Sequence, residues 1–315
     1  MNFQAIPPVQ NTKDLLEVAF KKARMKSKAT NLKGNWLQII RQKECLKIDV
    51  VKDTISNKLR KIMDDFPDTE ALPFFYIRLM KITLDYPEFK RSLGAINWAV
   101  GKILGFQKGY VSKITKTKDR VIIKGLTKEF YGRVASVLKQ IEKQLKFLEL
   151  SRKKMKNYPD IKDMFTVCIY GFPNVGKTTL LNKITGTKAE TAAYAFTTKS
   201  INVGYLKTKE NDIQLIDVPG TLARADKMNN IERLAELVVE ELANVIIFVF
   251  DLSGFSGYSI EVQQQLLERL GLLDKEKKIL IFLSKKDIID TDVIDGFELN
   301  HYSFNELKEI VFRSA

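Results

Sequence analysis

A glycine-rich segment that ends in lysine and threonine offers the clearest chemistry in the sequence. Gly171 and Gly176 are separated by four residues, and Lys177 and Thr178 follow directly. Glycines at this spacing let backbone N–H groups turn inward around a phosphate, while the lysine reaches the β- and γ-phosphates and the threonine hydroxyl ligates Mg²⁺. The segment is therefore predicted to be a phosphate loop. Its nucleotide-binding residues are Gly171, Phe172, Pro173, Asn174, Val175, Gly176, Lys177, Thr178 and Thr179.

Two polar segments further along could complete a metal and γ-phosphate site. A threonine in residues 189–206, with Thr198 preferred to Thr197, could ligate Mg²⁺ only when a γ-phosphate is bound. Asp217 could hold Mg²⁺ through water, and the Gly220 amide could reach the γ-phosphate. Asp-x-x-Gly is also a common turn, but here it ends an apolar strand about 40 residues after the phosphate loop. The predicted catalytic residues are Lys177, Thr198 and Gly220, the metal ligands are Thr178, Thr198 and Asp217, and Asp217, Val218, Pro219 and Gly220 join the nucleotide site.

A short charged run after an apolar stretch points to guanine as the base. Ser284, Lys285 and Asp287 follow residues 278–283. An aspartate there can accept from both N1–H and N2–H₂ of guanine, which adenine cannot offer, and the Lys285 stem can lie over the base. A solvated charged loop is the alternative. We expect GTP or GDP as ligand, with a last guanine-contacting loop within residues 296–302.

Strands and helices must position these motifs. Apolar segments 165–170, 212–216, 245–250 and 278–283 are predicted strands, and segments 177–185 and 304–313 are predicted helices. This alternation predicts an α/β P-loop GTPase domain over residues 161–315, with a mostly parallel sheet and helices on both faces.

Residues 1–160 instead show helical periodicity. Leu15, Leu16, Ala19 and Phe20 share one face, and an apolar stripe over residues 134–148 predicts a long final helix. Prolines 67, 73 and 87 separate further segments. We expect an all-α, antiparallel helical bundle domain over residues 1–160, with both tryptophans, Trp36 and Trp98, in its core.

Charge is distributed unequally between these two regions. The chain has 52 Lys and Arg against 38 Asp and Glu, and residues 1–160 hold 34 of the basic and 16 of the acidic residues. Three basic clusters lie at residues 21–28, 108–120 and 152–156. Such clusters bind RNA by releasing counterions from phosphates, although any single one could be a solvated helix end. The basic half is therefore predicted to bind nucleic acid.

Composition also excludes several classes of protein. Hydrophobic residues make up 45% of the chain, which excludes a disordered protein. Cys45 and Cys168 form no disulfide framework, and the N-terminus lacks the layout of a signal peptide. The longest apolar run, residues 245–250, is too short to span a bilayer. We expect a cytoplasmic monomer without a membrane partner.

With these motifs in place, the phosphate loop resembles that of the Obg-like GTPases. Residues 191–206, 217–220 and most specifically 251–260 resemble the Nog family, the nucleolar GTP-binding proteins and their archaeal relatives. The resemblance covers the whole chain and implies a factor in assembly of the large ribosomal subunit that binds ribosomal RNA. It also implies that Asn174 can help to hold K⁺, a second candidate ion beside Mg²⁺. The sequence departs from the family at Ser284, where Asn is usual.

The residues after Asp-x-x-Gly bear on mechanism. Thr221 and Leu222 stand where some GTPases place a water-orienting glutamine. We expect slow hydrolysis that depends on K⁺, on Arg224 or on a group from the ribosomal particle. Two alternatives stay open. One is a GTP-dependent RNA-binding placeholder with incidental hydrolysis, and the other is a membrane-associated regulatory GTPase, for which no lipidation motif is present.

Overall fold

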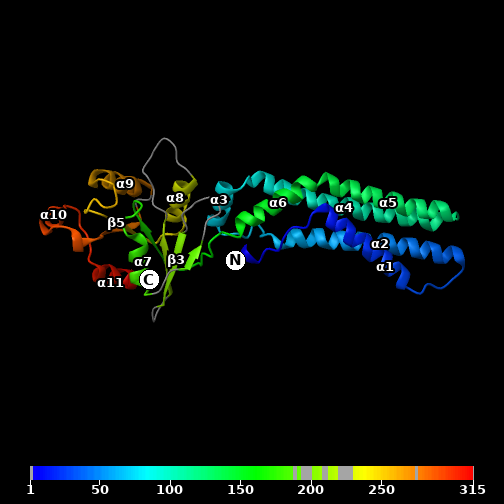
Figure 1. Ribbon diagram of the computed structural model, residues 1–315, viewed down its shortest axis with the longest axis horizontal. Coiled ribbons are helices and arrows are strands. Elements are labelled where there is room, and N and C mark those ends of the chain that lie inside the picture. The colour runs from blue at the N-terminus through cyan, green and yellow to red at the C-terminus, as the bar shows by residue number, and fades with distance from the viewer. Residues whose placement is uncertain are drawn as a thin grey trace. The chain divides into compact units, whose positions relative to one another are not determined.

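The chain forms two compact units in the computed structural model, which describes residues 3–186, 190–192, 201–207, 212–218, 230–273 and 276–314 (Figure 1). The helical unit consists of Gln4–Ala71 and Leu84–Lys156. The sheet unit consists of Met1–Phe3, Leu72–Thr83 and Asn157–Ala315. Among the described residues, every helix is too short or too polar to cross a bilayer.

The helical unit is a bundle of long helices with recognisable caps. Asn11 accepts a hydrogen bond from the Asp14 N–H (2.8 Å) at the start of its first helix, and Asn35 forms a capping box with Gln38 at the start of the second. The helices are α1 (Thr12–Ala29), α2 (Trp36–Asp65), α4 (Tyr86–Lys116), α5 (Arg120–Gln140) and α6 (Glu142–Met155). The predicted helical bundle is confirmed.

Aliphatic and aromatic side chains fill the bundle core. Leu15, Ile55, Ile96, Phe130 and Leu138 are fully buried, and burying each such side chain contributes about 1.5–3 kcal/mol before the entropy cost. The predicted stripe over residues 134–148 is buried, but it is divided between α5 and α6. The break is at Ile141, where the hydrogen bond from its N–H to the Val137 carbonyl lengthens to 3.4 Å.

The tryptophans do not lie in this core. Trp36 is 62% exposed and Trp98 is 42% exposed, so the prediction that both are buried was wrong. Trp36 stands at the first position of α2, and the Lys102 ammonium lies 5.8 Å from the Trp98 ring centroid. Aromatic identity alone does not reveal which face of a helix is turned outward.

The sheet unit contains a six-stranded sheet with strand order β2-β3-β4-β1-β5-β6. Its strands are β1 (Thr166–Tyr170), β2 (Glu190–Ala192), β3 (Ile201–Lys207), β4 (Asp212–Asp217), β5 (Val245–Phe250) and β6 (Lys278–Leu283). Strands β4, β1, β5 and β6 are parallel, whereas β2 and β3 pair antiparallel at one edge. Every residue of β1 and β5 is buried, as expected for the centre of a parallel sheet.

Helices cover this sheet, as Figure 1 shows with α9 on one side of the strands and α7 and α11 on the other. The bounds are α7 (Lys177–Thr185), α8 (Asn230–Leu242), α9 (Ile260–Leu273), α10 (Thr291–Asp295) and α11 (Phe304–Ser314). The mostly parallel α/β architecture predicted from the sequence is confirmed.

One helix of the N-terminal sequence belongs to the sheet unit. Helix α3 (Phe74–Thr83) lies against α8, and its residues Phe75, Tyr76, Leu79 and Met80 are buried. Arg78 bonds to both Glu240 (2.7 Å) and Glu241 (2.6 Å) of α8. The predicted helical domain over residues 1–160 did not anticipate this, because helical periodicity shows an apolar face but not the partner that covers it.

Candidate nucleotide site

The phosphate loop connects β1 to α7 at the carboxyl edge of the parallel strands. Gly171, Asn174 and Gly176 have φ angles of 145°, 62° and 98°. A Cβ on Gly171 would lie 2.8 Å from the Val249 carbonyl oxygen, so only glycine fits there. Phe172 and Val175 are buried beneath the loop, whereas Asn174 and Thr179 are exposed. The loop thus presents its backbone at the start of a helix, where N–H groups are open to an anion.

Lys177 is 7% exposed, and its ammonium donates to the Phe172 carbonyl (2.7 Å). This contact folds the side chain back over the loop that precedes it. The ammonium of Lys177, which was predicted to reach the β- and γ-phosphates, therefore lies against the backbone of the phosphate loop.

A hydroxyl and a carboxylate meet beside the loop. The Thr178 hydroxyl donates to Asp217 Oδ2, and Asp217 is 5% exposed at the end of β4. Two of the three predicted metal ligands are therefore in contact, although they lie about 40 residues apart in the sequence. Hydroxyl and carboxylate oxygens are donors that Mg²⁺ prefers, so these residues fit the ion.

Sequence reasoning missed a third member of this group. Asn202 of β3 stands opposite Asp217 in the antiparallel register, and its amide donates to Asp217 Oδ2 (2.9 Å). A polar residue inside an otherwise apolar strand was the available signal.

Several predicted residues lie outside the described part of the chain. They are Thr197, Thr198, Pro219, Gly220, Thr221, Leu222 and Arg224. Val218 is described and is buried, with its N–H bonded to the Ile169 carbonyl (3.0 Å).

The residues predicted to read the base follow β6, the strand beside β5. The Ser284 hydroxyl donates to the Phe250 carbonyl (2.9 Å), so this side chain braces the two strands. Gly176 and Ser284 are neighbours, since a Cβ on Gly176 would lie 3.6 Å from the Ser284 Cβ. Asp287 is exposed in a short 3₁₀ turn, Lys286–Ile288. The structure thus brings the phosphate loop and the predicted base-reading segment to one edge of the sheet.

The segment before α11 runs alongside β6. Tyr302 forms a parallel bridge with Phe282 and donates its N–H to the Ile281 carbonyl (2.9 Å) before α11 begins. The segment predicted to contact guanine last therefore runs beside β6. His301 lies in it, half-buried, with its ring 5.9 Å from that of Phe297.

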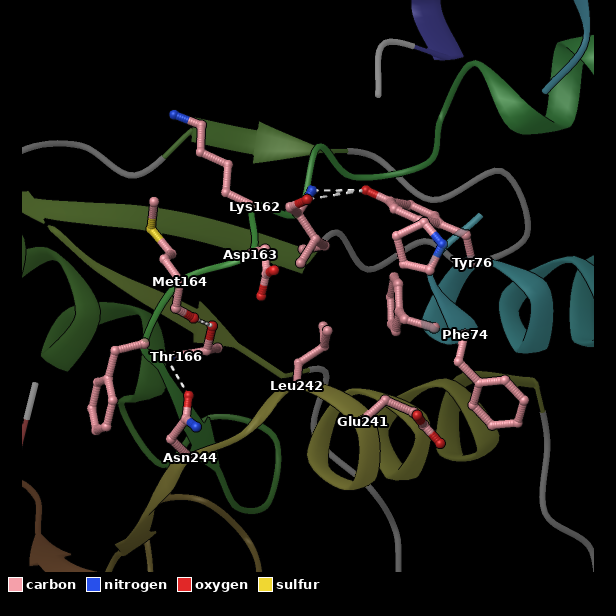
Figure 2. Close-up of a pocket in the computed structure, with 13 residues that line it drawn as sticks. Phe74, Tyr76, Lys162, Asp163, Met164, Thr166, Glu241, Leu242 and Asn244 are labelled. Atoms are coloured by element: carbon pink, nitrogen blue, oxygen red, sulfur yellow. Dashed lines mark hydrogen bonds between the residues drawn. The ribbon is translucent and has the colours of Figure 1, made fainter. Parts of the chain in front are cut away.

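A separate cavity of about 610 Å³ lies at the opposite end of β1 from the phosphate loop (Figure 2). It is lined by the start of α3, by residues 161–166 and by the end of α8. The Tyr76 hydroxyl accepts from the Ile161 N–H (2.9 Å) and donates to the Pro159 carbonyl (2.9 Å), and Asn244 accepts from the Thr166 N–H (2.8 Å). These contacts anchor the chain as it enters β1, so the cavity is separate from the candidate nucleotide site.

Two protein families match successive parts of the chain. Residues 3–162 match the NOG1 N-terminal helical domain, and residues 166–285 match the 50S ribosome-binding GTPase family. Together with the phosphate loop at the carboxyl edge of the sheet, the second match defines the sheet unit as a P-loop GTPase domain. The chain as a whole belongs to the Nog1 family.

Individual proteins and solved structures are similar to parts or all of the chain. Uncharacterized protein MJ1408 of Methanocaldococcus jannaschii is 39% identical over 258 residues, which cover 82% of this chain and 72% of the relative. Nucleolar GTP-binding protein 1 of Arabidopsis thaliana is 32% identical over 317 residues, 100% of this chain and 47% of the relative. The chain thus spans less than half the length of the nucleolar relative. The G domain of the T. maritima FeoB iron transporter is 27% identical, over 48% of this chain and 98% of that one, at a TM-score of 0.38.

Proposed function

We propose that this chain is a GTP-binding and GTP-hydrolysing factor that acts in assembly of the large ribosomal subunit. It binds ribosomal RNA or pre-ribosomal particles through the helical unit. The observation that carries this proposal is the joining, in one chain, of a NOG1 helical domain to a GTPase domain of the 50S ribosome-binding family.

The candidate nucleotide site supports the GTPase half of the proposal. Backbone N–H groups of the phosphate loop and Lys177 would hold the β- and γ-phosphates, and Thr178 with Asp217 would hold Mg²⁺. When bound, Mg²⁺ neutralises charge that develops on the phosphate oxygens. From the sequence, Thr198 and Gly220 would complete the γ-phosphate site, and Asn174 would help to hold K⁺. Lys285 and Asp287 would read guanine.

The helical unit supports the RNA-binding half. The Arg41 guanidinium donates to the Thr117 carbonyl through Nε (3.0 Å) and Nη2 (2.8 Å), which joins the start of α2 to the end of α4. The clusters at residues 21–28 and 108–120 therefore lie at the same end of the bundle, where the α1–α2 and α4–α5 connections also lie (Figure 1). We call this the basic end. Such a concentration of exposed cations favours a polyanionic partner.

The third cluster differs from the first two. Arg152 is 6% exposed, bonds to Glu149 (2.7 Å) and contacts the Ile6 carbonyl (3.4 Å). The Arg152 guanidinium and a hydrogen bond from the Val9 N–H hold the pKa of the Glu149 carboxyl below its usual range, although burial opposes them. Arg152 thus stabilises the bundle, and the basic end is the better candidate for RNA contact.

Hydrolysis is proposed to be slow without a partner, because Thr221 and Leu222 replace a water-orienting glutamine. A single-turnover rate that is already fast for the isolated protein would contradict this. Addition of large-subunit precursor particles and K⁺ should raise the rate.

Crosslinking the protein to RNA in cells and sequencing the fragments tests the proposal as a whole. The expected result is enrichment of large-subunit ribosomal RNA; recovery of only tRNA or mRNA would overturn it. Comparing release from particles with GTP and with a non-hydrolysable analogue tests the placeholder alternative, which predicts equal release rates. Binding to anionic vesicles in preference to RNA would favour the membrane-associated alternative.

A further inference from the structure

The segment at residues 251–260, between β5 and α9, is organised around one buried carboxylate. Asp251 is 1% exposed, and its Oδ1 accepts from the Ser253 N–H (3.0 Å) and from the Ser253 hydroxyl. Its Oδ2 accepts from the Ser256 N–H (2.8 Å) and from the Lys285 ammonium (2.7 Å). Burial would raise the pKa of Asp251, but the hydrogen bonds from Lys285, Ser253 and Ser256 outweigh it and lower the pKa. The carboxylate is therefore charged when it meets Lys285.

A buried glutamine holds the ends of this segment together. Gln263 is fully buried; its Oε1 accepts from the Asp251 N–H (2.9 Å), and its Nε2 donates to the carbonyls of Asp251 (2.9 Å) and Tyr258 (3.1 Å). The Tyr258 ring lies 4.4 Å from the ring of Phe172 in the phosphate loop. The segment is thus fixed on one side against the phosphate loop.

On its other side, the segment reaches the base-reading residues. Lys285 has a φ of 53°, which is uncommon for a residue with a side chain and costs of order 1 kcal/mol. Phe250 pairs with Leu283 in the β5–β6 register, so Asp251 and Lys285 emerge from adjacent strand ends. The ion pair with Asp251 holds the ammonium end of the Lys285 side chain, while the backbone of Lys285 turns away from the strand at its positive φ angle.

We infer that Asp251 is a positioning residue for guanine binding, which acts by holding the Lys285 ammonium so that the aliphatic stem of Lys285 lies along the base. This inference rests on the proposed binding of GTP and GDP. A free lysine side chain would lose rotamer entropy when a nucleotide arrives, whereas Lys285 is already ordered by Asp251. The benefit should appear as slower nucleotide dissociation.

Stopped-flow dissociation of a fluorescent GDP analogue from the protein, residues 1–315, tests this role. Asp251→Asn keeps the side-chain volume but replaces one of the two accepting oxygens by a donor. We expect dissociation about tenfold faster, the scale of one lost charge-assisted hydrogen bond. Glu261→Gln is the matched control, because it neutralises an exposed carboxylate on the first turn of α9 and should leave the rate unchanged.

A double-variant cycle separates positioning of Lys285 from support of the loop. Lys285→Met should itself speed dissociation, and Asp251→Asn should add less than twofold in that background. A full tenfold addition there, or no effect of Asp251→Asn in the wild-type background, would overturn the inference. Lys285→Arg should keep the ion pair and dissociate near the wild-type rate; equal rates for Arg and Met at this position would also overturn it, even if Asp251→Asn does not fold. A wild-type protein that binds no guanine nucleotide would instead overturn the proposed function.

Discussion

Individual residues of the phosphate loop are constrained by backbone shape before any ligand is considered. Gly171 has a φ of 145°, and a Cβ at this position would lie 2.8 Å from the carbonyl oxygen of Val249 in β5. Asn174 adopts the left-handed region at 62°, which asparagine tolerates better than most residues. The loop therefore contains backbone conformations that are uncommon in proteins, and the surrounding structure holds them in place.

Gly171→Ala should disturb both binding and stability. The added Cβ meets backbone rather than a flexible side chain, so we expect a loss of about 1–3 kcal/mol in the stability of the sheet unit and at least tenfold weaker GDP binding. Denaturant unfolding and equilibrium titration measure the two effects. Gly271→Ala on α9, with open space around the position, is the control and should be neutral or slightly stabilising. Equal behaviour of the two variants would contradict the steric argument.

Asp217→Asn should separate metal dependence from nucleotide binding. The amide keeps the shape of the side chain beside Thr178 and Asn202 but loses the charge that favours Mg²⁺. We expect the Mg²⁺ concentration needed for half-maximal GTP binding to rise about tenfold or more. Asp212→Asn, at the exposed start of the same strand, should leave the titration unchanged. An unchanged titration for Asp217→Asn would remove Asp217 from the predicted metal ligands.

At the scale of elements, helix α3 depends on α8 for its place in the sheet unit. The Arg78 side chain is 36% exposed, so its pairs with Glu240 and Glu241 are partly screened by solvent. The two pairs join one residue of α3 to neighbouring glutamates near the end of α8.

Arg78→Ala should loosen α3 locally. We expect hydrogen exchange of the α3 backbone amides to increase about fivefold, which corresponds to about 1 kcal/mol. Arg91→Ala removes a more exposed pair with Glu88 in the helical unit and should change exchange in α4 by less than twofold. If α3 exchange did not respond to Arg78→Ala, the two ion pairs would contribute nothing to its attachment.

Local pattern predicted some elements and not others, for physical reasons. Strands β5 and β6 and helix α7 have the predicted limits, because apolar runs bounded by glycine or charge are local signals. The contact of Thr178 with Asp217 followed from a motif, whereas Asn202 reaches the same carboxylate only through strand register. The partner of α3 and the exposure of Trp36 depend on contacts between distant segments, which periodicity does not encode.

For the whole molecule, charge is the property that divides the two regions most clearly. Residues 1–160 carry the entire excess of basic residues, and two of the three clusters meet at the basic end. The remaining residues are slightly acidic. For the proposed binding of RNA, this asymmetry favours one contact region in the helical unit rather than a uniformly cationic surface.

Replacing Lys113, Lys116 and Lys118 together by alanine should weaken RNA binding in a salt-dependent way. Each lost phosphate contact lowers the slope of log K against log salt by roughly 0.7–0.9, so we expect a decrease of about 2. The control is a triple alanine variant of Lys128, Lys139 and Lys143, which are also exposed but lie along α5 and α6. Equal losses in the two variants would show that net charge, rather than the basic end, attracts RNA.

The placement of α3 has a consequence for how the chain is made. A nascent chain emerges N-terminus first, so α3 appears about 150 residues before α8, the helix it contacts. At roughly 5–20 residues per second, α3 is synthesised on the order of ten seconds before α8. During that interval α3, which is mainly apolar, lacks its contact with α8. A fragment that stops at residue 156 lacks α8 permanently, together with the Pro159 and Ile161 backbone groups that bond to Tyr76. Such a fragment is expected to aggregate or to bind chaperones where the full chain does not.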